Sequence, residues 1–346
     1  MSTNTKAQRR LDAALDQAEA RGSCLAPATR ADDAALKRRL PKGEVISPAP
    51  GIFARPEYWL GLHPDERALS IMRGLGEKHP TWIFRSSSAA LAWGLDVPYP
   101  LALPVKAFAA CQPAAACDNL AVTPIHHQLP REMVGSVGDL RVTTFWESVL
   151  ECLLEAPFSW GLAVADSALR ASGWNAGQLV EFVRTAGKGR TGVRRALITA
   201  SYADGRAESG GESRLRALII VHGFQIPELQ VEIPDPTDPT CVYRVDHFWK
   251  TPDGRSVANE MDGFCKYEDE AMLDGRTPTE VLVAERQRES RLTLAGVTVL
   301  RFTYDDLQHP QKIDHLLTVA GVPRDMGAAR AWREAWDAAD PQAGNR

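Results

Sequence analysis

Residues 257–263, Val-Ala-Asn-Glu-Met-Asp-Gly, predict a β-strand that stops at a glycine. Glu260 and Asp262 are two positions apart, so on an extended strand their side chains point to the same face. The stretch 243–249, Tyr-Arg-Val-Asp-His-Phe-Trp, also predicts a strand and carries Asp246. If the two strands are neighbours, three carboxylates come together at one edge of a sheet.

Three carboxylates at one point suit a hard cation, because Mg²⁺ prefers oxygen ligands. The same residues also have a simpler interpretation, in which acidic side chains at strand ends are solvated or pair with arginine. The spacing of the acidic residues supports both interpretations equally.

Length and composition indicate an ordinary soluble protein of two or three domains, with 346 residues, 44% hydrophobic and 24% charged. The net charge is −4 and the isoelectric point about 6.1, so the chain has no overall basic character. Residues 211–310 carry 18 Asp and Glu against 11 Lys and Arg, a balance of −7. This acidic half argues against DNA binding unless some of its carboxylates are metal ligands.

The cysteines are sparse and form no C-x-x-C pair, which argues against a zinc ribbon. Their number suits a reducing compartment. The N-terminus lacks an apolar signal core, and no apolar run approaches the length of a membrane span. We therefore expect a cytoplasmic protein without a membrane partner.

Residues 31–60 predict the closing part of a winged helix. A helix with acidic residues at its start ends in a basic cluster, and two short strands at 45–47 and 51–54 follow around a Pro-Ala-Pro-Gly turn. The hypothesis is that residues 1–97 form a winged-helix-like DNA-binding region. The alternative is a solvated basic helix end beside an unrelated hairpin. The basic cluster consists of Lys37, Arg38, Arg39 and Lys42.

Residues 98–205 predict a middle region that passes from short strands to helices. Three of its basic residues, Arg190, Arg194 and Arg195, are further candidates for DNA contacts. Asp166 lies in an otherwise apolar helix, where we expect a structural hydrogen bond. The stretch 203–211, Ala-Asp-Gly-Arg-Ala-Glu-Ser-Gly-Gly, has linker composition, so we place a domain boundary there.

The last domain, predicted at 206–325 and followed by a C-terminal tail at 326–346, has the element order α-β-β-β-α-β-α. The predicted helices are 212–220, 279–295 and 305–319, and the predicted strands are 228–233, 242–249, 256–262 and 297–302. The fold class is therefore α+β with several domains.

This order, with Asp246 on the second strand and Glu260-x-Asp262 on the third, resembles the PD-(D/E)XK nucleases. It is more narrowly similar to the domain of unknown function 559 family, which is related to the very-short-patch-repair endonucleases. The resemblance implies a restriction-endonuclease-like α/β domain. It is carried by the strings 211–216 Gly-Glu-Ser-Arg-Leu-Arg, 244–246 Arg-Val-Asp, 260–267 Glu-Met-Asp-Gly-Phe-Cys-Lys-Tyr, 285–288 Glu-Arg-Gln-Arg and 296–301 Gly-Val-Thr-Val-Leu-Arg.

The first two-thirds of the chain resembles, less specifically, the winged-helix and linker regions of actinobacterial proteins akin to AbiEi-type abortive-infection antitoxins. Residues 85–90, Arg-Ser-Ser-Ser-Ala-Ala, and 93–95, Trp-Gly-Leu, carry this likeness. It implies a toxin or another defence-system protein as a partner, in addition to DNA.

The nuclease resemblance implies metal-assisted hydrolysis of phosphodiesters, with Mg²⁺ or Mn²⁺ held by Asp246 and Glu260 and joined by Glu212 from the first helix. The alternative for Glu212 is an acid that complements the dipole at a helix start. The usual third-strand motif is acid-x-lysine, but the lysine position here holds Asp262. An aspartate can hold a metal or accept a proton but supplies no positive charge. Lys266, four residues later, is a candidate to reach back.

The helix that follows carries Arg286 and Arg288, which the resemblance implies as phosphate contacts. Their alternative role is a solvated helix face paired with Glu285 and Glu289. Two functions follow from the sequence. The first is a metal-dependent DNA endonuclease in repair or phage defence. The alternative is a non-catalytic DNA-binding transcriptional regulator or antitoxin with a degenerate nuclease fold.

Overall fold

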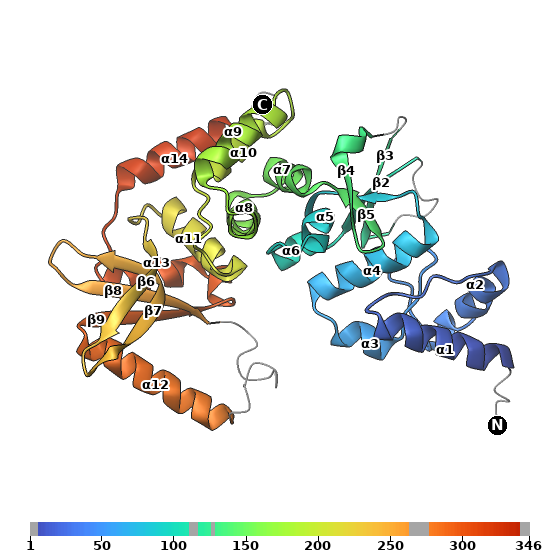
Figure 1. Cartoon of the computed structure of the whole chain (residues 1–346), viewed down its shortest axis with the longest axis horizontal. Coiled ribbons are helices and arrows are strands. Elements are labelled where there is room, and N and C mark those ends of the chain that lie inside the picture. The colour runs from blue at the N-terminus through green and yellow to red at the C-terminus, as the bar shows by residue number, and fades with distance from the viewer. Residues whose placement is uncertain (1–5, 111–116, 126–128, 263–276, 340–346) are drawn as a thin grey trace. The chain divides into compact units, whose positions relative to one another are not determined.

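The computed structural model describes residues 6–110, 117–125, 129–262 and 277–339 (Figure 1). The chain divides into two compact units, Met1–Ala156 and Pro157–Arg346. Each unit combines helices with one sheet of mixed strand direction, so the chain is an α+β protein with more than one unit, as predicted. No helix formed by the described residues has both the length and the apolar character needed to cross a membrane.

The first unit has a five-stranded sheet in the order β3-β2-β1-β5-β4. Its strands are β1 Ile83–Phe84, β2 Val105–Ala109, β3 Leu120–Pro124, β4 Val134–Val137 and β5 Leu140–Thr143. Its helices are α1 Lys6–Ala20, α2 Arg30–Lys37, α3 Pro56–Gly61, α4 Pro64–Lys78, α5 Ser86–Ala92, α6 Tyr99–Ala102 and α7 Phe145–Glu155, with short 3₁₀ turns η1 Leu40–Lys42 and η2 Arg131–Met133.

Helices α1 and α2 pack together at the start of this unit, where the sequence predicts a winged-helix-like region. Leu15 and Leu36 are fully buried between them, beside Phe53. The predicted hairpin is reduced to an isolated β-bridge between Ile46 and Ala54, and Phe53 instead forms a bridge with Leu25, outside the hairpin. The prolines of the turn lack the N–H groups that a longer ladder would need.

The second unit has a four-stranded sheet in the order β6-β7-β8-β9, in which β8 and β9 are parallel and the other pairs antiparallel. Its strands are β6 Glu228–Asp235, β7 Asp238–Lys250, β8 Ser256–Asp262 and β9 Val297–Thr303. Its helices are α8 Phe158–Ser172, α9 Ala176–Ala186, α10 Val193–Ser201, α11 Gly210–Val221, α12 Pro278–Leu294, α13 Pro310–Val319 and α14 Met326–Ala338, with a 3₁₀ turn η3 Asp306–Gln308. From α11 to α13 the order is therefore α-β-β-β-α-β-α, as the sequence predicts.

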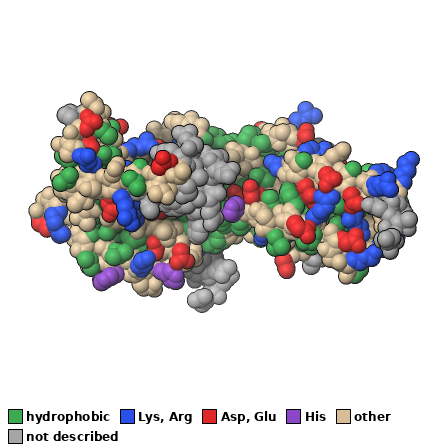
Figure 2. Space-filling model, turned by 90° about the horizontal axis from the view of Figure 1, so that it is seen from below, with side chains coloured by type: hydrophobic (Ala, Val, Ile, Leu, Met, Phe, Trp, Pro, Cys, Tyr) green, Lys and Arg blue, Asp and Glu red, His purple; other side chains and the backbone are tan. Residues whose placement is uncertain are grey.

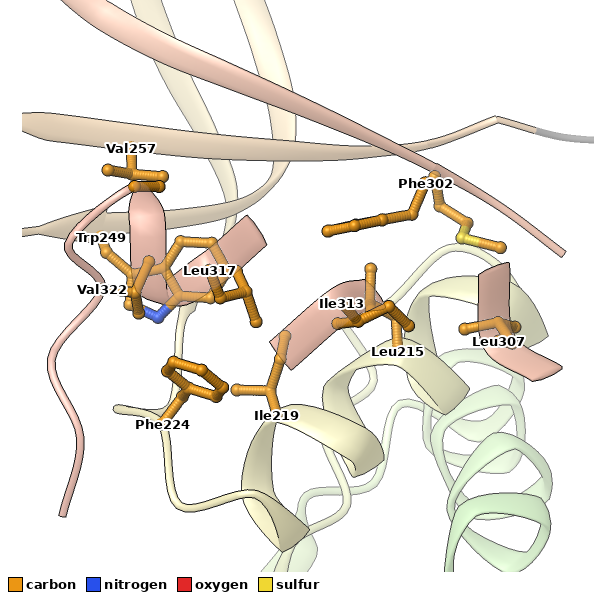
Figure 3. Close-up of a cluster of buried hydrophobic side chains, with 12 residues drawn as sticks. Leu215, Ile219, Phe224, Trp249, Val257, Phe302, Leu307, Ile313, Leu317 and Val322 are labelled. Atoms are coloured by element: carbon orange, nitrogen blue, oxygen red, sulfur yellow. The ribbon is translucent and has the colours of Figure 1, made fainter. Parts of the chain in front are cut away.

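One face of this sheet packs on α11 and α13, and the other packs on α12 (Figure 1). Figure 3 shows Trp249 and Val257 of the sheet facing Leu317 of α13 in the first of these layers. Trp249 is buried, and its indole Nε1 donates to the Gln225 carbonyl at 2.7 Å, so burial leaves no polar atom of the ring unpaired. This core fixes the strands on which the predicted carboxylates lie.

The two compact units divide between Ala156 and Pro157, and the predicted boundary at 205 falls inside the second unit. Helices α8 and α11 are joined across it by a buried ion pair, in which Arg216 donates to both carboxylate oxygens of Asp166 at 2.8 and 2.7 Å. Asp166 also accepts the backbone N–H of Asp204 at 2.8 Å, so its role is structural, as expected. The stretch 326–346, predicted as a tail, contains α14, whose Trp332 is buried against Phe158.

Candidate active site

The site lies where strands β7 and β8 part. Their antiparallel pairing runs from Lys250 opposite Ser256 to His247 opposite Asn259 and stops there. Two residues beyond Asn259, the Met261 N–H donates to Asp246 Oδ2 at 2.8 Å. The carboxylate of Asp246 therefore takes the place of a backbone acceptor. We call this point the strand fork, and both Asp246 and Glu260 are at the first positions beyond the last pair.

Strand β6 is also irregular at this level of the sheet. Gln230 has φ of +56° and is skipped between the register pairs Leu229–His247 and Val231–Val245, which places it across from Asp246. Its Nε2 donates to Glu212 Oε2 at 2.9 Å. A non-glycine residue in this left-handed conformation costs about 1–3 kcal/mol, which the surrounding contacts offset. Sequence reasoning missed Gln230, because nothing in the sequence indicates a left-handed glutamine within a strand.

Glu212 is in the first turn of α11, next to the fork. Its carboxylate accepts the Ser209 hydroxyl at 2.8 Å and the Glu208 N–H at 2.9 Å, while its own N–H donates to Ser209 Oγ. Glu212 therefore caps the helix start, as its alternative role implies. Burial raises the pKa of Glu212, and the negative charge of Asp246 raises it further. The two carboxylates are thus close enough to repel each other.

Glu260 and Asp262 are paired with arginines. Arg288 of α12 contacts Glu260 Oε1 in an ion pair without hydrogen-bond geometry, and Arg301 Nη2 of β9 lies 3.4 Å from Glu260 Oε2. Arg301 Nη1 lies 3.5 Å from Asp262 Oδ1 and 3.2 Å from Glu285 Oε1. This is the pairing that the simpler interpretation of the acidic stretch expects.

A metal ion at the fork would have to share the carboxylates with these arginines. Among the described residues, no three His, Cys, Asp or Glu side chains are gathered as a metal-binding group. The donor chemistry nevertheless suits Mg²⁺ or Mn²⁺, because Glu212 and Asp246 offer carboxylate oxygens whose mutual repulsion a cation relieves. Glu260 could join them only if Arg288 and Arg301 turned away. Lys266 lies outside the described residues.

A buried polar pair lies next to the strand fork, at the last residue pair of β7 with β8. His247 Nδ1 is 3.0 Å from Asn259 Oδ1, and Asn259 Nδ2 donates to the Leu300 carbonyl of β9 at 3.3 Å. Both side chains are fully buried, and burial lowers the pKa of His247 to about 4. The pair is therefore neutral at pH 7 and links β7, β8 and β9 just where the pairing of β7 with β8 ends.

The basic cluster predicted to contact DNA in the first unit is largely paired with acidic neighbours. Lys37 lies 2.7 Å from Asp33, and Arg39 lies 2.8 Å from both Asp12 and Glu44. Lys42 also faces Glu44, at 3.8 Å. Arg38, just after α2, is exposed and has no ion pair within the part of the chain that the structure describes.

The other predicted DNA contacts lie on the second unit and differ in exposure. Arg195 packs over the Trp336 ring, with its guanidinium carbon 4.9 Å from the ring centre, so it stabilises the docking of α14. Arg194 and Arg286 are exposed, and Arg190 is partly buried. On the face drawn in Figure 2, basic and acidic side chains of the described residues are interspersed. We therefore find no broad basic surface among the described residues of that face.

No family model matches the chain, and no solved structure matches it. Two proteins of Mycobacterium tuberculosis are similar to it, each 30% identical over 184 residues. They are uncharacterized protein MT2308 of strain CDC 1551 / Oshkosh and uncharacterized protein Rv2248 of strain ATCC 25618 / H37Rv. The match covers 53% of this chain and 62% of each relative, which is less than two-thirds of their length.

Proposed function

We propose that the second unit is a PD-(D/E)XK-type nuclease domain and that the protein is a metal-dependent DNA endonuclease. The observation that carries the proposal is the strand fork, where Asp246 and Glu260 are the first residues beyond the last β7–β8 pair and Glu212 lies near Asp246. The order α-β-β-β-α-β-α and the parallel pairing of β8 with β9 support the same fold. The winged-helix-like start of the chain, with Arg38 exposed, is proposed as a further DNA contact.

Asp246 and Glu212 would hold Mg²⁺ or Mn²⁺, joined by Glu260. The bound ion would polarise the scissile phosphate and lower the pKa of a coordinated water. Glu212, held in place by Ser209 and Gln230, would join the metal ligands or orient the coordinated water. Asp262, partly exposed at the end of β8, is a candidate to accept a proton.

The experiment tests cleavage and metal binding with the full chain. Supercoiled, linear, single-stranded and mismatched DNA are incubated with Mg²⁺ or Mn²⁺, and Mn²⁺ binding is followed by thermal stability. Asp246→Asn removes a charge, but its side-chain carbonyl can still accept the Met261 N–H, so the fold should be retained. We expect it to abolish the stabilisation by Mn²⁺, which amounts to about 2.7 kcal/mol at a hundred times the Kd.

Glu260→Gln should likewise stop nicking. Asp253→Asn is the matched control, because Asp253 is exposed in the turn at the other end of β7 and β8. Loss of cleavage in Asp246→Asn and Glu260→Gln but not in Asp253→Asn supports the proposal. Wild-type protein that neither cleaves any of these substrates nor is stabilised by Mn²⁺ contradicts it.

A second candidate is a non-catalytic DNA-binding regulator or antitoxin that keeps the nuclease fold. The observation that favours it is the pairing of Glu260 with Arg288 and Arg301, together with Asp262 at the usual lysine position. This candidate predicts that the protein binds DNA equally well with Mn²⁺ and with a chelator, and that it cleaves no substrate. A toxin or another defence protein would then be its partner.

A further inference from the structure

Arg301 occupies a specific place beside the fork. It is the register partner of Glu260 in the parallel β8–β9 pair, so the two side chains leave the same face of the sheet. Its three carboxylate contacts, to Glu260, Asp262 and Glu285, have N–O distances of 3.2 to 3.5 Å. Charge-assisted hydrogen bonds are usually about 2.7–2.9 Å long. The guanidinium is thus attracted to three carboxylates without being tightly bonded to one of them.

The neighbouring arginine is held differently. Arg288 Nη2 donates to the backbone carbonyl of Arg244 at 2.5 Å, and Nη1 contacts Glu260. Arg301 has no such backbone bond within the described residues, and its buried Nε has no hydrogen-bond partner there. Arg301 is therefore the more available of the two guanidinium groups, although about three-quarters of its side chain is buried, with 24% exposed.

The charges around the fork explain when Arg301 could act. Among the described residues at the fork, five carboxylates are accompanied by two arginines, so this group has an excess of negative charge, which repels phosphate. A divalent cation between Glu212 and Asp246 would reduce that excess and compete with Arg301 for Glu260. The members of this group are Glu212, Asp246, Glu260, Asp262, Glu285, Arg288 and Arg301.

We propose that Arg301 is a phosphate-binding residue of this site, held by Glu260, Asp262 and Glu285 until a divalent cation binds. It supplies the positive charge that lysine gives in the usual acid-x-lysine motif and that Asp262 cannot give. A planar guanidinium can bind two oxygens of a DNA phosphodiester at once. The inference rests on the proposed function, and it adds that metal and DNA bind to the site cooperatively.

The test measures metal and DNA binding separately on the full chain, with Arg301→Gln and Arg301→Lys. Mn²⁺ affinity is measured by calorimetry. Binding of a short fluorescent DNA duplex is measured by anisotropy over a NaCl series, with Ca²⁺ and again with EDTA. Arg255→Gln is the control, because Arg255 is an exposed arginine at the opposite end of the same strands and is paired only with Asp253 in the described residues.

We expect Arg301→Gln to change the two affinities in opposite directions. Mn²⁺ should bind about threefold to tenfold more tightly, because a competing positive charge next to Glu260 is gone. The Ca²⁺-dependent gain in DNA affinity should fall about tenfold, and the slope of log affinity against log salt should fall by about one. Arg301→Lys should keep part of the DNA gain. A merely structural role for Arg301 would weaken both affinities together.

The outcomes separate this inference from the proposed function. If Arg301→Gln keeps the Ca²⁺-dependent DNA affinity and the salt slope of the wild type, Arg301 does not bind phosphate and the inference is overturned. If the opposite changes occur but the wild type cleaves no DNA, the inference stands and the proposed hydrolysis fails. If Ca²⁺ gives the wild type no gain in DNA affinity, the inference is overturned, whatever the result of the cleavage assay.

Discussion

His247 should make the stability of the second unit depend on pH. It is fully buried beneath the strand fork, with Nδ1 against Asn259 and with Nε2 unpartnered among the described residues. Burial lowers its pKa from 6.5 to about 4, the hydrogen bond to Asn259 opposes this, and the charge of Arg216 adds to it. A protonated imidazole therefore fits the unfolded chain better than the folded one.

The size of the effect follows from the two pKa values. As the pH falls, the unfolded chain takes up a proton near pH 6.5, whereas the folded chain does not do so until about pH 4. Stability is thus fully present above pH 6.5 and decreases as the pH falls towards 4. A pKa difference of about 2.5 corresponds to about 3.4 kcal/mol, of which about 2 kcal/mol is already lost at pH 5.

The assay compares urea unfolding at pH 8 and pH 5 for the wild type and for His247→Gln. Glutamine does not titrate and keeps an N–H donor for Asn259, so the pH-dependent loss of unfolding free energy should be about 2 kcal/mol smaller in the variant. His315→Gln, at an exposed position of α13, is the control. If His247→Gln loses as much stability between pH 8 and pH 5 as the wild type does, the reasoning is refuted.

Two further predictions concern the elements that hold the fork. Asp166→Ala should lower the free energy of unfolding by about 3–5 kcal/mol, because it leaves Arg216 buried without its partner. Asp166→Leu and Arg216→Met made together should cost less than the sum of the same two changes made singly. If the losses of unfolding free energy measured with urea were additive in this double-mutant cycle, that would count against the pair. Gln230→Ala should cost about 1–3 kcal/mol, because Glu212 loses a hydrogen-bond donor, while alanine retains the strain of the left-handed φ that glutamine already has. Gln230→Gly should recover about 1 kcal/mol of this, and an alanine variant as stable as the glycine variant would contradict the strain argument.

The order of elements in the second unit could be predicted because it depends on short-range sequence patterns. Alternation along β8 and helical spacing in α11 and α13 depend only on neighbours in sequence. The same kind of pattern predicts the winged-helix hairpin, but its strands share an isolated β-bridge between Ile46 and Ala54, since Pro48 and Pro50 interrupt the pairing. The linker composition at 203–211 predicts a domain boundary, but this stretch lies inside the second unit. The ion pair of Asp166 with Arg216 crosses it, and local composition carries no information about such a long-range contact.

The residues of the candidate site likewise fall into those that the sequence indicates and those that it does not. Glu260 and Asp262 stand out in sequence because two acids alternate with apolar residues in one strand. Gln230 and Arg301 do not, because their importance comes from the residues opposite them on neighbouring strands. A register of pairing joins positions far apart in the chain, and no local pattern encodes it.

The strand fork also explains why the sequence supported two interpretations of the same acidic residues. A metal site and an arginine-paired strand end both require carboxylates at this edge of the sheet, so both predict the same local pattern. They differ in which positive charge neutralises Glu260. In the structure, Arg288 and Arg301 do so, while Glu212 and Asp246 still repel each other. A divalent cation would relieve that repulsion and free the arginines, so the two interpretations describe two charge states of one site if the protein is a nuclease. If it is a regulator, the arginine-paired state is the only one, and the affinity for DNA is independent of metal.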